Sequence, residues 1–179
     1  MLHDYHDLIS LFNGLFAQEY DTILVAGEQE PVYLPRTEGE SYHRIVFANG
    51  FFQSAMHEIS HWCIAGSERR CQVDYGYWYE PDGRSDVQQK LFERVEVKPQ
   101  ALEWLFCLAA GSRFYVSVDN LNASVPSDSA DFKRNIVSQA RKYATEGVNQ
   151  RSDKWIRVLN KFYKTSYPEA ASFNLESIQ

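Results

Sequence analysis

Apolar side chains recur at helical spacing in several segments of the chain. An opening helix is predicted by apolar residues at positions i, i+3, i+4, i+7 and i+8, which are Leu8, Leu11, Phe12, Leu15 and Phe16. The same spacing, or an unbroken apolar run, predicts further helices over residues 51–65, 100–110, 132–143 and 153–163. A polar helix is also expected over residues 86–96. The helix over residues 100–110 is apolar on nearly every side, so we expect it to be buried.

Short runs of β-branched and aromatic residues, separated by Pro and Gly, predict strands between these helices. The runs cover residues 22–25, 32–34, 44–47, 72–79 and 114–118. Helices combined with a small sheet indicate an α+β fold. The chain has no internal repeat and no long linker, so residues 1–179 are expected to form one domain, with 168–179 as a loose tail.

Two residues predict where helices end or begin. Gly66 follows the helix over residues 51–65, at the position where a glycine often adopts the left-handed αL conformation. Pro99 is expected to open the helix over residues 100–110, because proline is tolerated in the first helical turn. The segments before and after Pro99 are therefore predicted to be separate helices.

Composition and charge narrow the possible partners. With 44% hydrophobic and 15% aromatic residues in 179, the chain has the composition of a folded globular protein. A formal net charge of -6 argues against a broad phosphate-binding surface, so no nucleic-acid partner is expected. Three cysteines without a CxxC pair suit reduced thiols. No signal peptide and no long apolar segment are evident, so we expect a cytoplasmic protein without a membrane partner.

The strongest chemical signal is an HExxH motif within the helix over residues 51–65. His57 and His61 are four residues apart and therefore project from one helical face, where one metal ion can bind both imidazoles. Glu58 lies beside them and is the candidate catalytic residue. Two surface histidines with a solvated glutamate are the alternative interpretation, but the amphipathic helix favours a metal site.

Two histidines bind a metal weakly, so a third ligand from a later segment is expected. The candidates are Glu93, Glu96 and Glu103. Glu103 interrupts the apolar helix, where a buried carboxylate needs a cation or hydrogen bonds. Glu96 precedes Pro99, whose rigid ring could orient it toward the metal. Each of them could also be an ordinary solvated glutamate.

Other residues have both a structural and a functional interpretation. Cys63 and Cys71 lack zinc-ribbon spacing and are expected to be ordinary buried residues. Aromatic residues in the predicted strand over residues 72–79 could line a substrate pocket, although such residues more often lie in the core. They are Tyr75, Tyr77, Trp78 and Tyr79.

Three segments together resemble the elongation factor P hydroxylase family. They are HEISHWCIAG (His57 to Gly66), DYGYWYEPDGR (Asp74 to Arg84) and VEVKPQALEWLF (Val95 to Phe106). The resemblance extends from the opening helix to about Asp119 and is weaker toward the C-terminus. Three ordered segments of this length are far more specific than HExxH alone.

The resemblance implies a cytoplasmic monooxygenase that hydroxylates the lysylated lysine of translation elongation factor P. It implies a metal site formed by His57, His61 and Glu96, which suits non-haem Fe(II) with dioxygen as co-substrate. It also implies a fold with a metallopeptidase-like helix arrangement. The resemblance therefore favours Glu96 as the third metal ligand, whereas the burial argument favours Glu103.

The resemblance further implies an acidic protein partner, because elongation factor P is acidic. Basic residues near the site are therefore candidates for a docking rim, with Arg69 and Arg70 the first choice and Tyr77 as an aromatic substrate contact. The six candidates for the rim are Arg69, Arg70, Arg84, Lys90, Arg94 and Lys98.

Two other functions use the same motif. In a zinc metallopeptidase, Glu58 would act as general base toward a zinc-bound water. In a non-catalytic binding module, the metal would only stabilise the fold, and its removal would unfold the domain. The helix alone does not distinguish these functions, since all three use His57 and His61.

Overall fold

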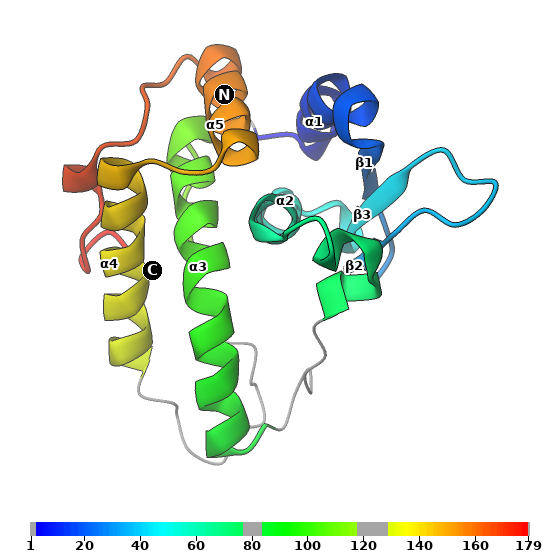
Figure 1. Ribbon diagram of the computed structural model, residues 1–179. Coiled ribbons are helices and arrows are strands. Elements are labelled where there is room, and N and C mark those ends of the chain that lie inside the picture. The colour runs from blue at the N-terminus through cyan, green and yellow to red at the C-terminus, as the bar shows by residue number, and fades with distance from the viewer. Residues whose placement is uncertain (1–2, 77–83, 118–128, 179) are drawn as a thin grey trace.

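Five α-helices and a three-stranded sheet make up the described part of the computed structural model, which covers residues 3–76, 84–117 and 129–178 (Figure 1). The helices are α1 (Tyr5–Tyr20), α2 (Phe52–Ile64), α3 (Asp86–Ala110), α4 (Ser129–Glu146) and α5 (Gln150–Tyr163). The strands are β1 (Thr22–Ala26), β2 (Val32–Leu34) and β3 (His43–Phe47). These elements share one core and confirm the predicted α+β fold in a single domain. None of the described helices is long and apolar enough to span a membrane.

The sheet is small and mixed. β3 lies in the centre, parallel to β1 and antiparallel to β2. Leu24, Ile45 and Tyr33 are in register across the three strands, and all three are buried. Because side chains alternate between the two faces of a strand, this row marks the face that packs into the core.

Helix α2 lies between the sheet and α3, and contacts both (Figure 1). Its buried residues recur at helical spacing, as predicted. They are Phe52, Ala55, Met56, Ile59, Ser60, Trp62 and Cys63. Helix α3 contacts α4 and α5 as well as α2. The helix with the HExxH motif is therefore held between the sheet and α3, and this packing fixes the directions in which its side chains project.

The prediction of two helices around Pro99 is wrong, because α3 continues through it from Asp86 to Ala110. Ser85 and Gln88 form a capping box at its start, and Gly111 ends it in the αL conformation. Pro99 has no N–H to donate to the Val95 carbonyl, a loss that normally disfavours an interior helical position. Packing of the apolar C-terminal half against three helices outweighs that loss.

Gly66 does not end α2 in the αL conformation, contrary to the prediction. The helix ends at Ala65 with extended backbone (φ -60°, ψ 125°). Side chains satisfy the terminal carbonyls instead: Asn149 donates to Cys63, Arg70 donates to Ala65, and Arg151 donates to both. Cations at a helix C-terminus also interact favourably with the helix dipole.

The predicted strand over residues 72–79 is wrong where the structure describes it. Residues 69–76 form two 3₁₀ turns, η2 (Arg69–Cys71) and η3 (Val73–Gly76). Asp74, Tyr75 and Gly76 have φ angles of 46°, 59° and 70°, which no strand allows. The side chain of Asp74 accepts a hydrogen bond from the Tyr33 N–H at 2.8 Å, and so anchors this turn to β2.

The strand predicted over residues 114–118 is also absent from its described part, residues 114–117. There the side chain of Gln100 takes the place of a neighbouring strand. It donates to the Ser117 carbonyl at 2.7 Å and accepts from the Ser117 N–H at 3.2 Å. One side-chain amide therefore holds this segment against α3.

The C-terminal segment packs onto the core. The sequence predicts a loose tail over residues 168–179, but Phe173 is fully buried, with its ring centroid 4.9 Å from that of Trp104. Ile178 is buried as well. The Trp104 contact and the contacts of residues 170–172 with α4 place the segment against α3 and α4.

The buried amide of Gln100 generates a prediction about stability. We expect Gln100→Leu to lower the free energy of unfolding by about 1–3 kcal/mol, because the backbone groups of Ser117 and an oxygen of Glu96 lose their partner. Urea unfolding measures the change. Gln53→Leu on the exposed surface of α2 is the matched control and should stay within about 0.5 kcal/mol of the wild type. If Gln100→Leu were as stable as Gln53→Leu, Gln100 would not be the residue that holds the segment around Ser117.

Candidate metal centre

His57 and His61 project side by side from α2. Their Nε2 atoms are 3.1 Å apart, and their ring centroids 4.7 Å. Both side chains are mostly buried, with 23% and 12% of their surface exposed. The sequence motif therefore has the geometry predicted for it, with two nitrogen donors converging on one point.

Glu96 on α3 completes a group of three donors. Its Oε1 lies 3.3 Å from Nε2 of His61, and its Oε2 lies 3.6 Å from Nε2 of His57. Donors bound to one ion at about 2.0–2.2 Å are separated by about 2.8–3.6 Å for angles between octahedral and tetrahedral. The observed separations fit one metal ion. Within the described residues, this is the group that could hold one.

The electrostatics of Glu96 also fit a cation. Its carboxylate is almost fully buried, and Oε1 accepts no hydrogen bond from any residue that the structure describes. Burial would raise the pKa of Glu96, but His61 and His57 outweigh it and lower the pKa to about 2. A buried, ionised oxygen without a donor is costly unless a cation binds it. Two imidazoles and one carboxylate suit Fe(II), and zinc also accepts them.

Glu103 contacts His57 at Nδ1, the ring nitrogen that does not belong to the three-donor group. Its Oε2 is 2.9 Å from Nδ1 of His57, and the side chain is buried. A carboxylate on Nδ1 fixes the ring and directs Nε2 toward a metal. Burial opposes a charged His57, but Glu103 and Glu96 outweigh it and raise the pKa of His57 to about 10. The sequence led us to expect a cation or hydrogen bonds around a buried Glu103, and the structure pairs it with Nδ1 of His57.

Glu58 is half-buried beside the two histidines and does not belong to the three-donor group. Burial raises its pKa, and the nearby imidazoles only partly oppose this. A carboxyl group with a raised pKa next to a metal site is suited to taking up or releasing a proton.

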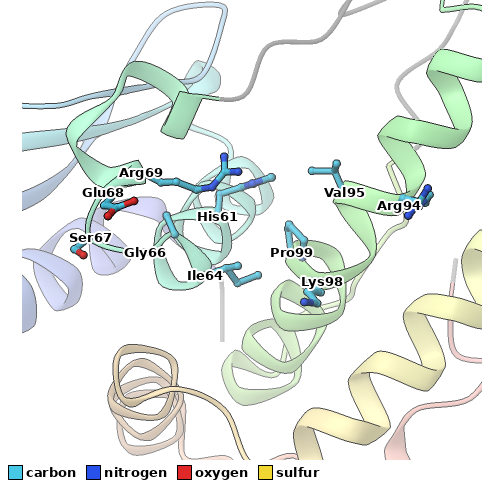
Figure 2. Close-up of a pocket in the computed structure, with 11 residues that line it drawn as sticks. His61, Ile64, Gly66, Ser67, Glu68, Arg69, Arg94, Val95, Lys98 and Pro99 are labelled. Carbon is cyan, nitrogen blue, oxygen red and sulfur yellow. The ribbon is translucent and has the colours of Figure 1, made fainter.

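A cavity of about 580 Å³ opens beside His61, between the end of α2 and the middle of α3. Figure 2 shows Val95 and Pro99 of α3 pointing toward His61, with Arg69 on the opposite side. Arg94 and Lys98 also line the cavity, together with one carboxylate, Glu68. Val95 and Pro99 therefore give the wall an apolar part, and the charged side chains of the lining are mainly basic.

The predicted rim residues divide into four groups. Arg69, Arg94 and Lys98 line the cavity, and Arg69 also donates a hydrogen bond to the Tyr75 carbonyl at 3.0 Å. Arg70 donates to the Ala65 carbonyl at 2.7 Å and so supports the end of α2. The prediction that Arg84 lies on the rim is wrong, because its guanidinium is buried 3.9 Å from the Phe92 ring centre.

Lys90 lies farther along α3, in a groove against α4. Tyr77, the aromatic residue predicted to contact substrate, lies outside the described residues, as do Trp78 and Tyr79.

Sequence reasoning missed the connection between Gln100 and the candidate metal centre. Its amide donates to Oε2 of Glu96 at 3.4 Å and also holds Ser117. The available signal was a polar residue at the start of an apolar helical run. Tyr75, considered for a pocket, is buried with its ring 4.3 Å from that of Tyr33 and nearly parallel to the ring of His61.

Two packed helices thus present a two-histidine, one-carboxylate donor group beside a cavity, which defines the class of a candidate mononuclear metal enzyme. The particular family follows from comparison with known proteins. The chain belongs to the Elongation factor P hydroxylase family, whose model matches residues 11–173. It is also 50% identical over 165 residues to the "Elongation factor P lysine hydroxylase" of Haemophilus influenzae, an alignment that covers 92% of each chain. These findings confirm the resemblance seen in the sequence.

The geometry predicts different metal affinities for variants of Glu96 and Glu103. Glu96→Gln removes the charged donor, and we expect at least a 100-fold loss of Fe(II) affinity. Glu103→Gln leaves all three donors in place but weakens the orientation of His57, and should cost about 10- to 100-fold. His57→Ala and His61→Ala should abolish stoichiometric binding.

Anaerobic metal titration, with folding checked by circular dichroism, measures these effects. Glu93→Gln, one turn from Glu96 on α3, is the matched control and should bind like the wild type. A larger loss in Glu103→Gln than in Glu96→Gln would transfer the ligand role to Glu103.

Proposed function

We propose that this protein hydroxylates the modified, lysylated lysine side chain of translation elongation factor P. The observation that carries the proposal is the position of the three-donor group within the segment matched by the family. The curated relative is named for hydroxylation of a lysine in the same factor. A translation factor as substrate also agrees with the proposed cytoplasmic location.

Fe(II) is the proposed metal, held by His57, His61 and Glu96, with dioxygen as co-substrate. Zinc accepts the same donors but has no redox chemistry, so it would not support hydroxylation by dioxygen. When bound, Fe(II) would supply dioxygen activation, for which a facial donor group with open positions is typical.

The residues around the metal have separate proposed roles. Glu103 keeps the His57 ring oriented, and Glu96 supplies the negative charge that balances the cation. Glu58, with its raised pKa, is the proposed catalytic residue that takes up or releases a proton. The apolar wall formed by Val95 and Pro99 would contact the long methylene chain of the substrate.

The proposed substrate contacts also include Arg69, Arg70 and Tyr77. Arg69 lies at the cavity, where it would contact acidic groups of the substrate protein. Arg70 acts mainly by holding the end of α2, so its effect on the substrate would be indirect. Tyr77 is kept as a proposed contact because of its place in the DYGYWYEPDGR segment.

A direct test combines metal analysis with mass measurement of the substrate. Protein purified without oxygen should contain Fe(II), and should add one oxygen atom to lysylated elongation factor P only when dioxygen is admitted together with a two-electron reductant, because the second oxygen atom must be reduced to water. Replacing Fe(II) with zinc should abolish the mass change while leaving the fold unaltered. Hydroxylation by the zinc form, or a mass change without dioxygen, would contradict the proposed chemistry.

Replacing Glu58 distinguishes the hydroxylase from the zinc metallopeptidase. We expect Glu58→Gln to retain metal and to lower kcat about 100-fold, because the amide cannot transfer a proton. Glu68→Gln, which removes a carboxylate from the cavity wall, is the control and should have a much smaller effect on kcat. Peptide cleavage that requires Glu58 would favour the peptidase, and an unchanged kcat would remove Glu58 from the mechanism.

A further inference from the structure

The N-terminal half of α3 exposes two aliphatic side chains one turn apart. Val87 is 79% exposed and Leu91 is 61% exposed. A single exposed apolar residue is ordinary, but adjacent ones on one helix form a patch that water solvates poorly. These residues are well suited to contact another molecule.

The exposed pair belongs to a longer row that leads to the metal centre. Val87, Leu91, Val95 and Pro99 are spaced four residues apart, and such residues form a continuous ridge along a helix. Exposure falls along this ridge, from Val87 and Leu91 at the surface to half-buried Val95 and buried Pro99. The ridge is about 18 Å long at 1.5 Å per residue. It thus extends from solvent to the cavity that contains His61, as Figure 2 shows for Val95 and Pro99.

Basic residues flank the part of the ridge that lines the cavity. Arg94 and Lys98 lie next to Val95 in the helix, and both are exposed. Arg69 adds a third cation from the opposite wall, against the single carboxylate of Glu68. The charged residues that line the cavity are thus mainly basic, whereas the chain as a whole carries a net charge of -6. A partner here should present acidic and apolar groups together.

We propose that the α3 ridge, defined as Val87, Leu91, Val95 and Pro99 with flanking Arg94 and Lys98, docks the segment of the protein substrate that carries the target lysine. The segment contacts Val87 and Leu91 through an apolar side chain and pairs acidic groups with Arg94 and Lys98. The target side chain then follows Val95 and Pro99 to the metal centre. This inference rests on the proposed function, and it specifies how that substrate binds.

The test measures binding of lysylated elongation factor P to full-length protein loaded with Fe(II) and kept free of oxygen, so that no turnover occurs. Val87→Ser with Leu91→Ser should weaken the Kd about 10- to 100-fold, because two apolar contacts are lost. Arg94→Glu with Lys98→Glu should weaken it by at least about 10-fold at low salt, and by less at high salt. Unchanged melting temperatures show that folding is intact.

Matched controls carry the same substitutions outside the ridge. Leu175→Ser changes a leucine that is 49% exposed in the C-terminal segment, and Lys161→Glu changes an exposed lysine of α5. Both should bind like the wild type. A ridge variant that binds as tightly as these controls would overturn the proposal.

Two further readouts separate this inference from its alternatives. Sedimentation velocity reports whether the ridge instead contacts a second copy of this chain: a dimer lost in the ridge variants with substrate binding retained would overturn the proposal. Mass analysis of the substrate after oxygen and a two-electron reductant are admitted reports the chemistry independently. If binding depends on the ridge but no hydroxylation follows, the proposed activity is overturned and the docking surface is supported. If the wild type does not bind elongation factor P at all, the proposed activity and the docking surface are both overturned.

Discussion

The candidate site depends on the burial of one carboxylate, Glu96, between two helices. An ionised glutamate inside a protein is stable only if positive charge and hydrogen bonds replace the water that it loses. Gln100 gives one hydrogen bond to Oε2, whereas Oε1 faces His61 without a donor among the described residues. The packing of α2 against α3 holds these groups together. A metal ion at this point would provide the remaining compensation.

The HExxH helix could be predicted because its determinants are local. Helical spacing alone places His57 and His61 on one face, and the apolar residues that recur along the same helix place another face in the core. The choice of the third ligand, in contrast, does not follow from local determinants. Glu96 and Glu103 are seven residues apart on α3 and therefore lie on nearly the same face, so which of them reaches Nε2 and which reaches Nδ1 of His57 depends on how α2 and α3 pack. Local sequence contains no information on that packing.

The wrong predictions about secondary structure also result from contacts between residues far apart in the sequence. Pro99 was expected to begin a helix because proline disfavours an interior position, but contacts with neighbouring helices outweigh a local preference of about 3 kcal/mol. Gly66 was expected to cap α2, yet Asn149 and Arg151, more than 80 residues away, bind the terminal carbonyls. Residues 72–76 have strand-like composition, but Asp74 bonds across to Tyr33 and holds a turn. Each prediction failed where a distant residue supplied the decisive interaction.

The uninterrupted course of α3 has consequences for how binding and chemistry are connected. Its inward face carries Glu96 and Glu103, and a neighbouring row of the same helix carries the ridge from Val87 to Pro99. A helix that ended at Pro99 could change the angle between its halves, and the carboxylate would then move relative to the ridge that we propose as the docking surface. One continuous helix restricts such movement, since both sets of side chains share its backbone. The position of a docked segment relative to the metal centre is thus set by the helical geometry of α3.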